Sequence, residues 1–170
     1  YEEFMSRYLE QLQSFEIGPV ISDSHRDKVM SYVELAIQEG GNILAGGNIP
    51  DKPGSWIEPT VIGGLSHKSR TATEEIFGPV VTIHQFDSDD EAIKMANSTQ
   101  YGLAGSVWSK NKGRAIAEKI DSGMVWVNTW LHRDLRVPFG GVKDSGVGRE
   151  GGMWSVGFFS EAVNICVMED

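Results

Sequence analysis

The most reactive side chains in this sequence belong to one cysteine and four histidines. Cys166 could act as a nucleophile or a metal ligand only as a thiolate. It lies in the apolar run AVNICVM (162–168), without a neighbouring His, Lys or helix N-terminus to favour that form, so we expect a packing residue. The histidines show no HxxxH or Cys–His spacing, which predicts no metal site at His25, His67, His84 and His132.

Charged and aromatic residues in two turn-rich stretches are the next candidates. Glu75 lies just before a Gly-Pro pair, and by residue type alone its carboxylate caps or solvates a turn. By the same reasoning Arg133 pairs locally with Asp134 and Arg136 faces solvent, as most exposed charges do. Phe139 lies in a Gly-rich loop, where an aromatic ring most often joins a core. Residue type therefore leaves structural and ligand-binding roles open for all four candidates.

Helices and strands that could position these residues follow from the hydrophobic pattern. Residues 22–39 are predicted to form a helix that Ser22 caps and that ends at Gly40-Gly41. Its apolar face should comprise Val29, Val33, Ala36 and Ile37. A second helix is predicted over 1–13. Short apolar runs between Gly and Pro predict strands at 42–45, 57–62 and 79–86.

After residue 88 helices and strands alternate. Helices are predicted at 89–97 and 111–121, and strands at 104–108 and 123–127. This alternation favours βαβ units, so we expect an α/β fold with three αβα layers and a mainly parallel sheet shared by 79–86, 104–108 and 123–127. Residues 140–157 contain many glycines and predict a shaped loop, and 161–168 alternate as a terminal strand. We expect one domain over 1–148 and a C-terminal helix and strand over 149–170.

Composition narrows the classes of function. The chain has 170 residues and a net charge of −9, and an acidic surface opposes the binding of nucleic acid. The sequence contains neither an apolar run long enough for a membrane span nor a signal peptide, and we expect no membrane partner. A single cysteine cannot form an internal disulfide, which makes the cytoplasm the default compartment.

Three motifs occur in order along the chain: TEEIFGPVV (73–81), NSTQYGLAGSVWS (97–109) and PFGGVKDSGVGRE (138–150). Together they resemble the signature of the aldehyde dehydrogenase superfamily. The resemblance implies oxidation of a small-molecule aldehyde through a cysteine thiohemiacetal and thioester, with NAD (or NADP) as hydride acceptor. It also places the catalytic cysteine, the general base and the dinucleotide domain upstream of these motifs. We therefore expect the C-terminal part of a catalytic domain, inactive by itself and without bound cofactor.

The resemblance also gives roles to the candidate residues. Glu75 and Phe77 match positions that hold the nicotinamide half of the cofactor, with Glu74 as a solvated neighbour. Phe139 matches an aromatic residue that lines the aldehyde entrance. The loop WLHRDLRVPFGG (130–141) is similar to the branch of 2-aminomuconate and 2-hydroxymuconate semialdehyde dehydrogenases. Arginines there suggest a carboxylate on the substrate, bound by Arg133 and Arg136.

Other interpretations stay open. The stretch at 12–22 is shorter than in family members, so its structure is uncertain from sequence. The terminal strand 161–168 is expected to assemble homo-oligomers, as the corresponding tail does in the family. A catalytically dead assembly module could use that strand to extend the sheet of a partner. A free-standing protein that binds a small acid is a third possibility.

Overall fold

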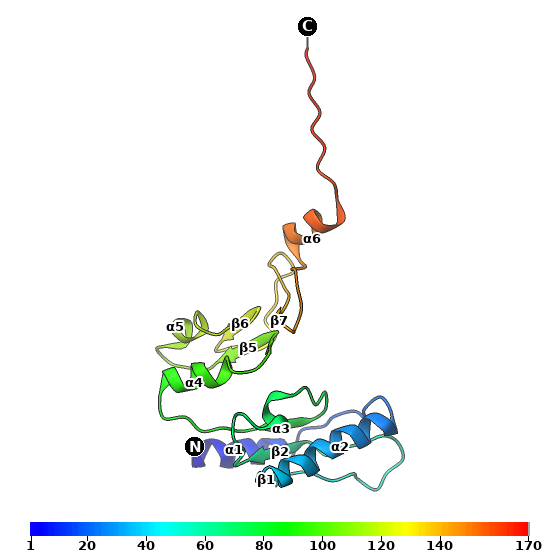
Figure 1. The fold of residues 1–170 in the computed structure, drawn as a ribbon, viewed down its shortest axis with the longest axis vertical. Helices are drawn as coiled ribbons and strands as arrows, with labels where there is room; N and C mark the ends of the chain where they lie inside the picture. Colours follow the sequence, from blue (N-terminus) through cyan, green and yellow to red (C-terminus); the bar gives the residue numbers. More distant parts are fainter. Residues whose placement is uncertain (170) are drawn as a thin grey trace. The chain divides into compact units, whose positions relative to one another are not determined.

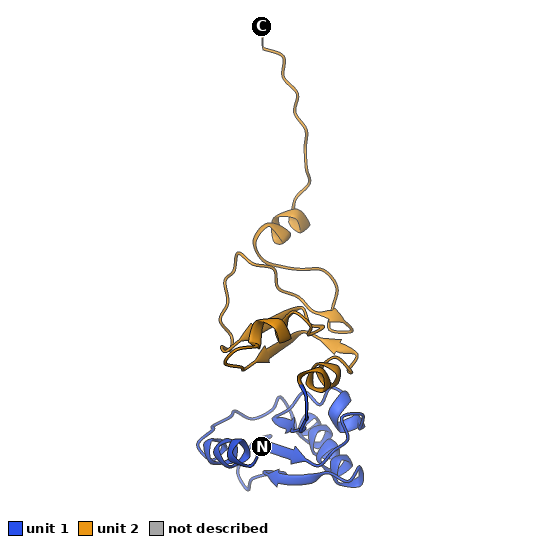
Figure 2. Ribbon diagram, turned by 90° about the vertical axis from the view of Figure 1, so that its left-hand side faces the viewer, with its two compact units in different colours: residues 1–88 blue, residues 89–170 orange. Residues whose placement is uncertain are grey.

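The structure is a computed structural model that describes residues 1–169 (Figure 1). The chain divides into two compact units, residues 1–88 and the residues from 89 onward (Figure 2). Both units combine helices with short strands, which confirms the predicted α/β class. The sheets are small and partly parallel.

Two helices open the first unit: α1 spans Glu2–Leu12 and α2 spans Asp23–Gln38. Ser22 caps α2 as predicted, because its hydroxyl accepts a hydrogen bond from the backbone N–H of His25 at 3.2 Å. Ile37, predicted on the buried face, lies instead at its edge and is 58% exposed. The residues of that face which are buried are Val29, Val33 and Ala36.

A three-stranded sheet completes the first unit. Its strands are β1 (Asn42–Ala45), β2 (Thr60–Gly63) and β3 (Val80–Thr82), in that spatial order. Strand β2 runs antiparallel to β1 and parallel to β3, and it is buried along its length. The short helix α3 (Arg70–Thr73) lies between β2 and β3 in sequence. Buried apolar side chains form a core cluster in this unit, which comprises Ala36 of α2, Ile62 of β2 and Leu65.

The second unit contains the predicted βαβ arrangement. Strand β5 (Ala104–Val107), helix α5 (Gly113–Ala117) and strand β6 (Met124–Val127) follow one another, and β5 and β6 pair in parallel. Helix α4 (Asp89–Ala96) precedes them. The remaining elements are β4 (Tyr101–Gly102), which pairs antiparallel with β7 (Val142–Lys143), and α6 (Gly152–Phe159).

The predicted sharing of one sheet by three strands is wrong. Strand β3 pairs with β2, whereas β5 pairs with β6 in a separate sheet of the other unit. Hydrophobic spacing shows where strands occur, but the neighbour of a strand is decided by backbone hydrogen bonds between distant segments. Several strands are also shorter than predicted: β2 begins only after Pro59, whose nitrogen cannot donate to a ladder.

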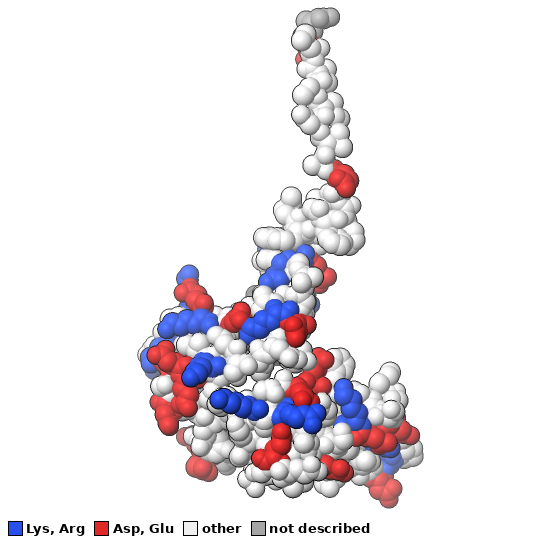
Figure 3. Space-filling view, in the orientation of Figure 1, with Lys and Arg blue, Asp and Glu red and all other residues white. Residues whose placement is uncertain are grey.

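The C-terminal segment is predicted as an unpaired strand of this chain alone, and its pairing with a second copy stays a prediction. Residues 161–168 pair with no other strand in the part of the chain that the structure describes, and a strand needs a neighbour for its backbone groups. Cys166 is exposed, so its expected packing role is not observed within these residues. From α6 to residue 168 the only charged side chain is Glu161, and this segment is almost free of charge colour in Figure 3.

Elsewhere, charges of both signs are intermingled on the surface of each unit (Figure 3). Among residues 1–169, no helix is both long and apolar enough to cross a bilayer. The same residues contain no group of three or more His, Cys, Asp or Glu side chains that could hold a metal ion.

Candidate functional site

The turn at residues 74–78 follows the end of α3 in the first unit. Glu74 is fixed there, because its carboxylate accepts from Arg70 Nε at 2.7 Å and from the Tyr32 hydroxyl at 2.9 Å. The hydrogen bonds from Arg70 and then from Tyr32 hold the pKa of Glu74 below its usual range. Glu74, expected as a solvated neighbour, remains partly exposed and also anchors the turn through these two contacts.

Glu75 and Phe77 lie on the exposed side of this turn. Glu75 is exposed and Phe77 is 74% exposed. The backbone of Phe77 is in the left-handed region, with φ at 60°, a conformation that residues other than Gly rarely adopt. Its carbonyl oxygen lies 2.7 Å from His25 Nε2 on α2. The first unit thus presents a carboxylate and an aromatic ring together, two residues apart, on one turn.

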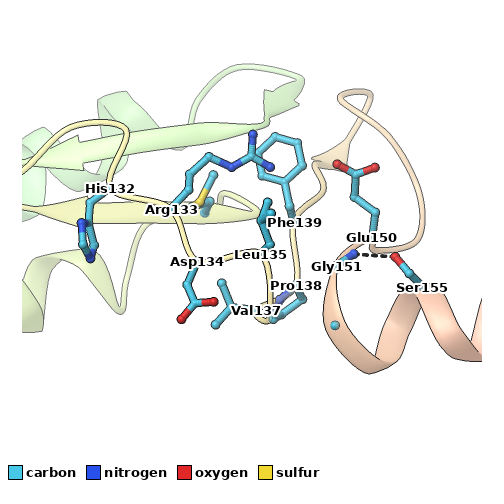
Figure 4. Close-up of a pocket in the computed structure, with 12 residues that line it drawn as sticks. His132, Arg133, Asp134, Leu135, Val137, Pro138, Phe139, Glu150, Gly151 and Ser155 are labelled. Carbon is cyan, nitrogen blue, oxygen red and sulfur yellow. Dashed lines mark hydrogen bonds between the residues drawn. The ribbon is translucent and has the colours of Figure 1, made fainter.

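A cavity of about 330 Å³ lies in the second unit, between the loop that follows β6 and the start of α6 (Figure 4). Arg133 and Phe139 both line it. The guanidinium carbon of Arg133 lies 4.3 Å from the centroid of the Phe139 ring, so the cation is stacked on the ring face. The structure therefore brings two of the predicted substrate residues together at one cavity.

Arg136 does not line this cavity. Its guanidinium binds the carboxylate of Asp134 through two nitrogens, and Arg136 Nε lies 2.9 Å from Asp134 Oδ1. This pairing lowers the pKa of the Asp134 carboxyl and raises that of Arg136. By residue type Asp134 could have paired with Arg133, but in the structure it pairs with Arg136. Arg133 forms no ion pair within residues 1–169.

Two features hold the loop beside the cavity. The indole N–H of Trp126, in β6, donates to the His132 carbonyl at 2.8 Å. Gly151 and Gly152 allow the chain to approach the loop backbone: a Cβ at Gly152 would lie 2.2 Å from the carbonyl oxygen of Arg136. Both glycines also have positive φ, which fits their residue type. The loop is thus braced at both ends by its own unit.

Sequence reasoning missed the residues that position both regions. His25 was weighed only as a metal ligand, Tyr32 was not singled out, and Trp126 was read as part of an apolar strand. A buried Trp or Tyr usually directs its polar atom to a partner, so residue type gave a signal for two of them. The identity of the partner, however, depends on the fold.

Comparison with known proteins decides the family. The model of the aldehyde dehydrogenase family matches residues 3–165, which is nearly the whole chain. The chain belongs to this family. The family signature predicted from the three sequence motifs is therefore confirmed.

Several aldehyde dehydrogenases are similar in sequence. A 2-aminomuconic 6-semialdehyde dehydrogenase from a Pseudomonas species is 53% identical, over 91% of this chain and 33% of that protein. A 2-hydroxymuconic semialdehyde dehydrogenase from Pseudomonas sp. strain CF600 is 44% identical, over 98% of this chain and 38% of that protein. The chain spans about a third of the length of these relatives.

A solved aldehyde dehydrogenase has the same fold. The betaine aldehyde dehydrogenase from Staphylococcus aureus, crystallised in complex with NAD+, superposes with a TM-score of 0.88 and 38% identity. The match covers 93% of this chain and 35% of that one. The fold of this chain therefore corresponds to one part of a larger aldehyde dehydrogenase.

The roles of the candidate residues in this aldehyde dehydrogenase chain stay predictions. Glu75 and Phe77 lie on one exposed turn, as a cofactor contact requires. Arg133 and Phe139 share a cavity, as a substrate contact requires. Arg136 is engaged by Asp134, which weakens its candidacy relative to Arg133.

Proposed function

We propose that this chain is the C-terminal portion of an NAD-dependent aldehyde dehydrogenase that oxidises a semialdehyde bearing a carboxylate. The observation that carries the proposal is Arg133, a guanidinium at the cavity that stacks on Phe139 and has no ion pair within residues 1–169. A guanidinium can bind a carboxylate through two parallel hydrogen bonds. The two similar Pseudomonas enzymes are both named for muconic semialdehydes, which supports this substrate class.

The cofactor side of the proposal rests on the turn in the first unit. The exposed carboxylate of Glu75 can accept hydrogen bonds from ribose hydroxyls, and the exposed ring of Phe77 offers a flat apolar surface beside it. The bound nicotinamide supplies the hydride acceptor, and the residues of this chain bind and orient it. The solved relative in complex with NAD+ supports this cofactor, whereas the choice between NAD and NADP depends on the adenosine ribose.

The catalytic cysteine and the dinucleotide domain belong, in this proposal, to the remainder of a longer protein, called the whole enzyme from here on. Cys166 lies exposed in the C-terminal segment, and its hydrogen-bonding neighbour is Asn164 at 3.7 Å. Within residues 1–169 this partner is an amide oxygen, which is neither a base nor a cation that would activate a thiol. The isolated chain is therefore proposed to be inactive.

NADH formation tests this function. The whole enzyme with NAD+ and a muconic-type semialdehyde should produce NADH, and the isolated 170-residue chain should produce none. Turnover by the isolated chain that survives Cys166→Ser would show that its catalytic groups lie elsewhere in these residues. Turnover that this substitution abolishes would make Cys166 the nucleophile. Absence of turnover by the whole enzyme would overturn the proposed activity.

A second candidate function is an assembly module without catalysis. It is favoured by the exposed apolar side chains of the C-terminal segment, which include Phe158, Phe159, Val163, Ile165 and Val167. A contiguous apolar surface with an unpaired extended segment favours association, and the same surface would assemble the enzyme as a homo-oligomer. Light scattering should show association of the chain. A monomer at high concentration would contradict self-association through this segment.

A further inference from the structure

One face of α2 carries the turn that presents Glu75 and Phe77. His25, Val29 and Tyr32 are four and three residues apart, a spacing that puts them on the same side of a helix. Each of the three contacts a different residue of the turn. The turn therefore rests on a single helical face.

The contacts are distributed along the whole turn. Tyr32 donates its hydroxyl proton to Glu74 Oε2 at 2.9 Å, at the start of the turn. Val29 is fully buried, and its nearer methyl group would lie 2.6 Å from a Cβ placed at Gly78, so any larger residue there would force Val29 or the turn to move. His25 binds the carbonyl oxygen of Phe77 at 2.7 Å.

The contact of His25 determines which of its ring nitrogens carries the hydrogen, and it holds a backbone conformation. A carbonyl oxygen can only accept, so the Nε2 atom of His25 must carry the hydrogen. The acceptor belongs to Phe77, whose left-handed backbone is disfavoured for a residue with a side chain. The ring of His25 also meets the Phe77 ring edge to face, with centroids 6.2 Å apart. The histidine therefore stabilises the strained residue from two directions.

We infer that His25 is a positioning residue for the cofactor: it holds the Phe77 backbone in the conformation that presents Phe77 and Glu75 to NAD. This inference rests on the proposed cofactor role of the turn. Without the hydrogen bond, Phe77 relaxes toward an ordinary backbone conformation and carries the Glu75 carboxylate with it. His25 then acts on cofactor binding without contacting the cofactor.

Steady-state kinetics of the whole enzyme test the inference. His25→Leu removes the donor and should raise KM for NAD roughly 3- to 10-fold, about the loss expected for one hydrogen bond, with KM for the aldehyde unchanged. His25→Gln keeps an N–H donor and should restore much of the affinity. The matched control is His84→Leu, a partly buried histidine of the same unit whose ring contacts Thr82, and it should leave KM for NAD unchanged.

The outcomes separate the inference from the function on which it rests. If Glu75→Ala does not raise KM for NAD, the proposed cofactor role fails. If Glu75→Ala raises it but His25→Leu does not, or if His25→Leu changes both KM values equally, the positioning role of His25 fails. If His25→Leu does not fold, His25→Phe keeps an aromatic ring against Phe77, removes the donor, and should raise KM for NAD by a similar factor. An unchanged KM for NAD in that variant would also overturn the inference.

Discussion

The turn at 74–78 and the loop at 130–141 are built in opposite ways. The turn is fixed by side chains of α2 that are 42 and 52 residues away in sequence. The loop is fixed over shorter separations within its own unit: Asp134 and Arg136 are two residues apart, Trp126 and His132 are six apart, and the Gly152 N–H donates to the Leu135 carbonyl from 17 residues away. A locally built loop can change its side chains without disturbing a distant helix. This arrangement suits the proposed roles, a cofactor contact at the turn and a substrate contact at the loop.

The largest predicted effect is at the loop, for Arg133→Leu in the whole enzyme. Loss of a guanidinium that binds a substrate carboxylate should cost roughly 2–4 kcal/mol, about 30- to 1000-fold in kcat/KM toward an acidic semialdehyde. Uncharged aldehydes of similar size should be nearly unaffected. Arg136→Leu serves as the control and should have a smaller effect, because Asp134 already binds that guanidinium. An equal loss for charged and uncharged substrates would indicate damage to the loop instead.

At the turn, Glu75→Ala should have the next largest effect. Loss of the hydrogen bonds that ribose hydroxyls donate to this carboxylate should cost about 1.5–3 kcal/mol, roughly 10- to 150-fold in kcat/KM for NAD. Because Glu75 is exposed, the thermal stability should change little. Glu74→Ala makes the contrast, since it removes the anchor to Arg70 and Tyr32 and should lower stability as well. If the two variants show the same changes in kcat/KM for NAD and in thermal stability, the two carboxylates have no separate roles.

The close packing of the loop against β6 depends on Gly123, the residue before that strand. A Cβ there would lie 1.7 Å from the carbonyl oxygen of Gly140, the middle residue of the FGG motif. Gly123→Ala should destabilise the second unit by about 1–3 kcal/mol in urea denaturation, because a backbone atom must move. Gly105→Ala is the control: its nearest neighbour would be 3.7 Å away, and the change should stay within about 1 kcal/mol. Similar losses for both would contradict this explanation.

Acid should weaken both regions by a small amount. Arg70 and Tyr32 lower the pKa of Glu74, and Arg136 lowers that of Asp134. A folded-state pKa below the unfolded value gives stability that is present above the unfolded pKa and is lost as the pH falls through the folded one. Stability should therefore decline below about pH 4. Glu74→Gln should flatten this decline in urea denaturation at pH 7 and pH 3, and an unchanged slope would exclude Glu74 as a source.

Local patterns predicted the elements but not their partners. Ser22 capped α2 as expected, and β5, α5 and β6 formed the expected βαβ unit, because these features depend on neighbouring residues. The placement of β3 in a different sheet from β5 was not predictable from periodicity. A motif singled out Glu75 and the loop at 130–141 singled out Arg133, whereas the contacts that hold the turn join residues tens of positions apart and have no local signature.

Ligand binding by the whole enzyme tests the separation of turn and loop most directly. Calorimetric titration should be made with NAD+ and with an unsaturated dicarboxylate that resembles the acid product, for Glu75→Ala and Arg133→Leu. Glu75→Ala should lower only the affinity for NAD+, and Arg133→Leu should lower only the affinity for the dicarboxylate, each by at least about 10-fold. If either variant weakens both ligands equally, or leaves its own ligand unaffected, the assignment of the turn to the cofactor and the loop to the substrate is contradicted.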